Sequence, residues 1–199
     1  LHGVRNIFHF AGQYGWFLGI SLLPLTQVFA LEFTVPLWTA LIACFFLNEK
    51  LTLRKVLAIA LGILGVIVIV QPSIEIVDYA SLVVLGAAIC YSISHVSIKS
   101  LPSTESPLTI LFLMCLIQLP IGLSFSLLNW KNPASMQWGW ITVIGITALS
   151  AHYCMTKAMQ YAEVTAVVTM DFLRLPVIAI IGVAFYSESL TMTLRSEER

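Results

Sequence analysis

Charged residues are scarce in this sequence. Lysine, arginine, aspartate and glutamate make up 10% of the 199 residues, whereas hydrophobic residues make up 59%. A soluble domain is about 25% charged, so a chain of this composition cannot cover its surface with polar groups. The 10 basic and 10 acidic residues also cancel, which argues against a nucleic-acid partner. The composition therefore predicts an all-α membrane protein that crosses the bilayer several times.

The sequence also lacks the common motifs of enzymes and metal sites. It contains no G-x-S-x-G motif, no H-E-x-x-H motif and no histidine pair at metal-binding spacing. Its cysteines lie inside apolar segments without C-x-x-C spacing, and we interpret them as small core residues; they are Cys44, Cys90, Cys115 and Cys154. We therefore expect no catalytic residue, no metal and no cofactor. An intramembrane enzyme is the least favoured interpretation.

Seven apolar segments predict seven transmembrane helices. Each is close to the length of about 20 residues that crosses the hydrocarbon core. The segments are 4–23, 25–48, 51–70, 79–98, 108–128, 138–161 and 164–186.

The second segment carries an acid at mid-depth. Glu32 lies in otherwise apolar sequence, where a charge costs about 2.5–3.5 kcal/mol. Flanking apolar residues, worth about −0.3 to −0.6 kcal/mol each, carry it into the membrane. Pro36 lacks an N–H group, so it leaves the carbonyl of Glu32 without its helical partner. This combination predicts the wall of a site.

The stretch around Glu32 occurs twice. At an offset of 139 positions the matching pairs are Tyr14/Tyr153, Thr26/Thr165, Val28/Val167, Glu32/Asp171, Phe33/Phe172, Glu49/Glu188 and Leu51/Leu190. Common apolar composition does not readily align both membrane acids and both Glu-x-Leu-Thr runs. We therefore interpret the match as an internal repeat.

The basic residues near the ends of the segments predict that the two copies are inverted. Most of them fall on one side of the predicted topology, namely Arg5, Lys50, Arg54, Lys55, Lys99 and Lys157, whereas the opposite loops contain only Lys131. This asymmetry places the lysine-rich side in the cytoplasm. Segments one and two recur as segments six and seven, five spans later. Because five is odd, the copies enter the membrane from opposite faces, as in secondary transporters.

Several motifs carry a family resemblance over nearly the whole chain. They are PLTQVFALEFTVP at 24–36, LNEKL at 47–51, the exit from Gly62 to Pro72, KAMQYA at 157–162 and ESL at 188–190. With these motifs the chain resembles the EamA-like family of the drug/metabolite transporter (DMT) superfamily. The resemblance implies a ten-helix (5+5) carrier of the bacterial inner membrane. Its central cavity would be lined by the helices that correspond to segments one, two, four, six and seven.

The same resemblance implies a division of the chain. We expect 1–72 to hold the last three helices of the first repeat, 73–78 to be a linker, and 79–199 to hold the first four helices of the second repeat. The chain would then be a fragment of a ten-helix protein. The polar run 191–199 stands where a tenth span would begin.

Nine residues are candidates for binding a substrate or a proton. Glu32 and Asp171 would bind a cationic group or a coupling proton, unless each only satisfies a neighbouring helix. Arg174, three residues after Asp171, is either its ion-pair partner or an anion-binding residue. Together the three leave one surplus negative charge, which leads to the hypothesis that one carboxylate exchanges a proton during transport. The weaker candidates, for which helix-to-helix hydrogen bonding is the alternative, are Gln13, Tyr14, Tyr91, His95, His152 and Tyr153.

The sequence favours a secondary transporter that moves a small organic metabolite by alternating access, with proton coupling as an option. The resemblance implies amino acids, nucleotide-like metabolites, vitamins or drugs as substrate classes. The expected partners are a small-molecule solute and the lipid bilayer, with a homodimer as a further option. The alternative is a truncated, non-transporting remnant or a partner subunit.

Overall fold

The structure of the chain, a computed structural model, describes residues 2–23, 25–70, 79–101, 105–128, 130–174 and 177. Within these ranges all regular secondary structure is helical, which confirms the predicted fold class. The elements are α1 (His2–Leu22), α2 (Leu25–Glu32), α3 (Val35–Phe46), α4 (Leu53–Val70), α5 (Tyr79–Lys99), α6 (Pro107–Leu127), α7 (Ser135–Tyr161), α8 (Val164–Thr169) and the 3₁₀ helix η1 (Met170–Leu173). The expected linker at 73–78 and the repeat residues from 178 onward, Glu188 included, lie outside the described residues.

Each predicted span corresponds to a helix or a pair of helices. The second span is divided into α2 and α3, and the described part of the seventh consists of α8 and η1. By length and hydropathy alone, three stretches of the described chain qualify as membrane spans: Gln27–Phe46, Tyr79–Lys99 and Pro107–Leu127. The helix α1 carries Arg5, Asn6 and His9, and the bundle buries all three of these polar side chains.

Both copies of the repeat interrupt their helix beside the acid. In the first copy α2 ends at Glu32 and α3 begins at Val35. Pro36 lies in the first turn of α3, where a backbone N–H would have no helical partner in any case. In the second copy the α-helix changes to a 3₁₀ helix at Met170, one residue before Asp171. The interruption that Pro36 predicts is thus present in both copies.

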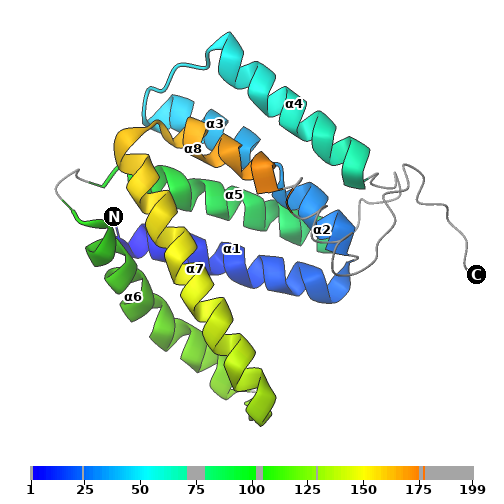
Figure 1. The fold of residues 1–199 in the computed structure, drawn as a ribbon, viewed down its shortest axis with the longest axis vertical. Helices are drawn as coiled ribbons and strands as arrows, with labels where there is room; N and C mark the ends of the chain where they lie inside the picture. The colour runs from blue at the N-terminus through cyan, green and yellow to red at the C-terminus, as the bar shows by residue number, and fades with distance from the viewer. Residues whose placement is uncertain are drawn as a thin grey trace, which may run out of the picture.

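The corresponding helices of the two copies run in opposite directions. In Figure 1, α1 starts at the end of the bundle where α3 finishes, whereas α7 finishes there and α8 starts there. The backbone N–H of Val164, at the start of α8, donates a hydrogen bond of 2.9 Å to Glu49, just after α3. We call this end the lysine end, because Lys50 follows Glu49 there, Lys55 pairs with Glu49 and Glu163, and Lys99 binds the carbonyls at the end of α7. The arrangement is the one that an inverted repeat requires.

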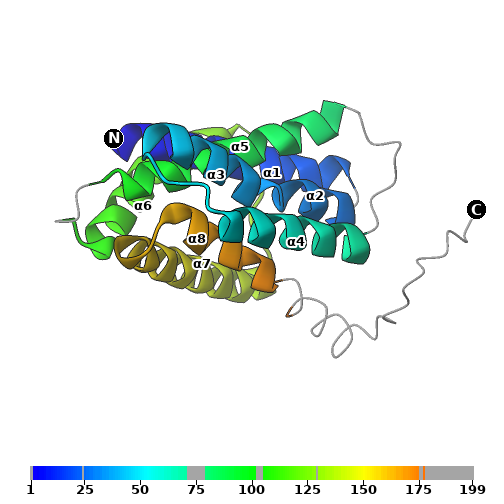
Figure 2. The same ribbon diagram turned by 90° about the horizontal axis from the view of Figure 1, so that it is seen from above.

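The helices form a bundle around α5. This helix packs along α1 and also contacts α2, α3, α7 and α8. Figure 2 shows α1 and α5 on one side of the bundle, α4, α7 and α8 on the other, and α2 and α3 between them. Near the middle, the repeat-related rings of Phe33 and Phe172 stack, with centroids 5.9 Å apart and planes at 19°. Equivalent residues can touch only near the axis that relates the copies, so this pair lies close to it.

Close packing of α4 against this stacked pair generates a prediction about stability. A Cβ atom added at Gly62 would overlap the ring of Phe172, whereas one added at Gly65 would meet nothing within 4 Å. We expect Gly62→Ala to lower the free energy of unfolding by about 1–3 kcal/mol through overpacking. The matched Gly65→Ala should leave it unchanged or raise it by up to about 1 kcal/mol. Thermal unfolding of the purified chain in detergent measures both, and equal melting temperatures for the two variants would contradict this packing.

Candidate functional site

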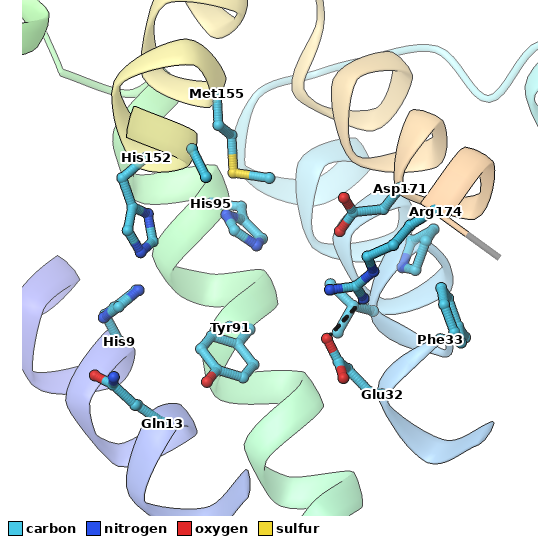
Figure 3. A pocket seen from close by; sticks show the side chains of 13 residues that line it. His9, Gln13, Glu32, Phe33, Tyr91, His95, His152, Met155, Asp171 and Arg174 are labelled. Atoms are coloured by element: carbon cyan, nitrogen blue, oxygen red, sulfur yellow. Dashed lines mark hydrogen bonds and ion pairs between the residues drawn. The ribbon is translucent and has the colours of Figure 1, made fainter. Parts of the chain in front are cut away.

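A cavity of about 250 Å³ lies where α1, the α2–α3 junction, α5, α7 and η1 meet (Figure 3). These are the helices that correspond to predicted segments one, two, four, six and seven. The residues that line the cavity are His9, Gln13, Glu32, Phe33, Val35, Pro36, Tyr91, His95, Ala151, His152, Met155, Asp171 and Arg174. Seven of the nine candidate residues are therefore brought together in one place.

The cavity lies where the two copies of the repeat meet, and both copies line it. Three pairs of its lining residues are separated by the repeat offset of 139 positions, namely Gln13/His152, Glu32/Asp171 and Val35/Arg174. Each copy thus contributes the same positions to the lining of the cavity. The remaining polar wall comes from α5, which adds Tyr91 and His95.

The carboxylate of Glu32 is fully engaged. One oxygen, Oε1, accepts a hydrogen bond of 2.8 Å from Nη2 of Arg174. The other, Oε2, accepts one of 2.8 Å from the indole Nε1 of Trp16. The guanidinium of Arg174 also lies over the ring of Phe33, 5.2 Å from its centroid. The two copies are therefore joined by an ion pair in the lining of the cavity.

Arg174 forms an ion pair, but not with Asp171, which the sequence offered as one of two alternatives for it. Its partner is Glu32 of the other copy and not Asp171, three residues earlier on the same helix. Spacing along a helix reports only local neighbours. The closer partner in space comes from a segment 142 residues away, which spacing alone does not reveal.

Asp171 lines the cavity beside the ion pair of Glu32 and Arg174. Its side chain is half-buried and turned toward the cavity in Figure 3. In the described part of the chain it forms no hydrogen bond and no ion pair. The two repeat-related acids therefore differ: Glu32 holds the copies together, and Asp171 keeps its oxygens available.

Three histidines gather at the other side of the cavity. The ring of His9 lies 4.9 Å from that of His152 and 5.7 Å from that of Tyr91, measured between centroids. Nδ1 of His9 is 3.0 Å from the side-chain amide nitrogen of Gln118 on α6. His95 is 8% exposed, and its Nδ1 has no hydrogen-bonding partner among the described residues. The cavity thus offers an unpaired ring nitrogen as well as an unpaired carboxylate.

Sequence reasoning missed two residues of this region. His9 lines the cavity, and its spacing of four residues from Gln13 on one helix face is a signal that could have found it. Trp16 donates to Glu32, although its residue type alone indicates packing. Nothing in the sequence distinguishes it from other membrane tryptophans.

The structure does not bring Tyr14 and Tyr153 to the cavity. Tyr14 is 53% exposed and its ring lies 5.7 Å from that of Phe125. Tyr153 is 37% exposed and faces an apolar groove between α6 and α7. Adjacent residues on a helix point about 100° apart, so neither tyrosine shares the face of its neighbour, Gln13 or His152.

Arg5 is buried behind the histidines rather than exposed at the membrane surface. Its side chain is 0% exposed, and its guanidinium donates to Oδ1 of Asn6 at 3.0 Å and to the sulfur of Met114 at 3.5 Å. The described residues provide it with no carboxylate partner. It is thus a buried positive charge on α1, and the orientation inferred from the basic residues stays a prediction.

The fold and the cavity define a helical membrane protein with a polar internal site built from two oppositely oriented copies of one motif. Comparison with known proteins identifies the family. The EamA-like transporter family matches residues 3–71 and 78–194, which together make up most of the chain. The chain belongs to the EamA-like transporter family.

Several curated relatives are similar over most of this chain. The S-adenosylmethionine uptake transporter of Rickettsia prowazekii is 24% identical over 188 residues, covering 94% of this chain and 64% of that protein. The riboflavin transporter of Brucella anthropi is 32% identical over 190 residues, covering 92% and 66%. The riboflavin transporter of Vibrio cholerae is 30% identical over 189 residues, covering 85% and 63%. The chain thus spans a little under two thirds of the length of these relatives.

A solved crystal structure has the same fold. It superposes with a TM-score of 0.79 at 18% identity, covering 96% of this chain and 70% of the solved chain. At this identity the likeness establishes the fold alone.

The different environments of the two acids generate a prediction. Glu32→Gln should lower the free energy of unfolding by about 1–3 kcal/mol, because it leaves the half-buried Arg174 without a counter-charge. Asp171→Asn removes no described contact and should change it by less than about 0.5 kcal/mol. Thermal unfolding in detergent compares the variants, and a larger loss for Asp171→Asn would refute this division of roles.

Proposed function

We propose that this protein acts in a carrier that moves a small organic metabolite across the bacterial inner membrane by alternating access. The observation that supports the proposal best is the cavity at the meeting point of two inverted copies, with Asp171 as its free carboxylate. In this proposal 1–72 and 79–199 belong to successive repeats. The family membership and the relatives named as transporters support the same conclusion.

Inverted copies provide a physical basis for alternating access. Two segments with related sequences and opposite orientations can exchange conformations, so that a path open on one face closes as its counterpart opens on the other. The ion pair between Glu32 and Arg174 joins the copies at the cavity, where such an exchange must be centred. Loss of this pair would uncouple the copies.

Asp171 is proposed to bind either a proton or a positively charged group of the solute. The acids and the arginine that line the cavity leave one negative charge unmatched, and a lone carboxylate inside a membrane protein is costly. A proton or a cationic group would remove that cost.

Uptake into proteoliposomes tests the proposal, with S-adenosylmethionine and riboflavin as probes because relatives are named for them. We expect uptake of at least one probe above that of empty liposomes. If Asp171 carries the coupling proton, Asp171→Asn should abolish the dependence of uptake on pH. If it binds the solute instead, the same variant should raise the concentration needed for half-maximal uptake.

Tyr153→Phe is the control. Tyr153 lies outside the cavity, so this substitution should leave uptake unchanged. Glu32→Gln should reduce the rate by destabilising the junction between the copies. Uptake that is unaffected in both acid variants, with unaltered pH dependence, would remove the acids from the mechanism. If the folded chain takes up neither S-adenosylmethionine nor riboflavin, the result would favour a non-transporting partner or remnant.

A further inference from the structure

The turn between α7 and α8, residues 162–163, is held at the lysine end by charged side chains from other elements. Lys99, the last residue of α5, donates from its Nζ to the carbonyl oxygens of Met159 and Ala162, both at 2.8 Å. These carbonyls belong to the end of α7, where partial negative charge favours an ammonium group. The end of α5 therefore binds the end of α7.

The first copy of the repeat holds the other side of the same turn. Oε1 of Glu49 accepts a hydrogen bond of 2.9 Å from the backbone N–H of Val164. Its Oε2 lies 3.3 Å from Nζ of Lys55, which also pairs with the carboxylate of Glu163 at 2.5 Å. Glu49 is only 8% exposed. Lys99, Glu49 and Lys55 thus fasten the turn to α5, to the loop before α4 and to the first turn of α4.

Apolar packing fills the space between this turn and the cavity. A cluster of buried side chains from α3, α5, α7 and α8 includes Val35, Ala43, Ala88, Val96, Ile98, Met159, Val164 and Val168. Tyr91 and Met155 pack against this cluster and also line the cavity. The cavity is therefore separated from the lysine end by packed side chains, with the charged contacts outermost.

We propose that the α7–α8 turn is the gate of the cavity at the lysine end, and that Lys99, Glu49 and Lys55 form the latch that keeps it shut. This inference rests on the proposed carrier function and assigns the control of access to its cavity. The latch holds the second copy of the repeat through Glu49 and Lys55, which belong to the first copy. Opening at the lysine end requires the turn to leave these partners, so that α7 and α8 withdraw from the apolar cluster.

The chemistry of the latch suits a reversible contact. On the α7–α8 turn, Lys99 and Glu49 bind backbone groups at helix ends, which water can satisfy once the turn moves away. The side chains of Lys55 and Glu163 are 13% and 55% exposed, so their pair is already within reach of solvent. An apolar seal alone has no directional contacts with which to fix the position of the turn.

Accessibility of the cavity from each face tests the latch without requiring a known solute. The experiment uses the full chain with its four cysteines replaced by alanine and one reporter, Ala151→Cys, in the cavity. A membrane-impermeant maleimide is applied to right-side-out and to inverted vesicles. In the unlatched variants Lys99→Met and Glu49→Gln we expect the rate of labelling from the lysine end to rise about tenfold. Loss of one hydrogen bond to a charged group is enough to shift the equilibrium between the shut and open gate by this factor. Labelling from the opposite face should fall.

Lys50→Met is the matched control. Lys50 is exposed in the same loop as Glu49, and its side chain makes no hydrogen bond or ion pair with any described residue, so labelling should not change. A variant that merely unfolds is recognised because its labelling rises from both faces.

If labelling from the lysine end is equal in the reporter background and in both unlatched variants, the latch is overturned. The proposed function of the cavity is not affected by that result. An increase from both faces in both variants would overturn it too, because these side chains would then serve only stability. Absence of labelling from either face in every variant would instead contradict the proposed function, since the cavity would not be reached from solution.

Discussion

The ion pair between Glu32 and Arg174 is the interaction on which the rest of this structure depends. A carboxylate in mid-membrane must be neutralised or hydrated, and Glu32 is neutralised by a side chain from the other copy of the repeat. That requirement brings the two helix interruptions face to face, stacks Phe33 on Phe172 and leaves Asp171 unmatched beside them. The cavity is the space that this pairing encloses.

Much of the fold could be predicted from the sequence, because segment length, apolar composition, proline and the internal repeat each constrain the helices directly. Apolar segments of membrane-spanning length predict the helices, and Pro36 predicts the break after Glu32. The repeat predicts which residues face one another, and the pairs Gln13/His152 and Glu32/Asp171 do line the same cavity. Contacts between distant segments are different. The partner of Arg174, the donor Trp16 and the burial of Arg5 follow from how helices rotate against one another, which residue type and spacing do not determine.

The polar groups of the bundle are arranged in two layers with distinct roles. In the middle, side chains from five segments surround a small cavity, in which the Asp171 carboxylate and Nδ1 of His95 have no hydrogen-bonding partner among the described residues. At the lysine end, charged side chains bind the helix-end backbone groups where α7 ends and α8 begins. Apolar packing separates the layers. The proposed carrier function needs this combination, because the binding site must be polar while the path to it can be closed and reopened.

Cross-linking of the two repeat-related phenylalanines tests the central claim most directly. In a cysteine-free background, Phe33→Cys combined with Phe172→Cys should be joined within one chain by a short bifunctional maleimide, because their rings lie 5.9 Å apart. The control combines Phe46→Cys with Phe172→Cys. It should not react, because Phe46 lies about 20 Å from Phe33 along the helix. Equal cross-linking in both pairs, or none in the first, would contradict a structure in which two inverted copies meet at the cavity.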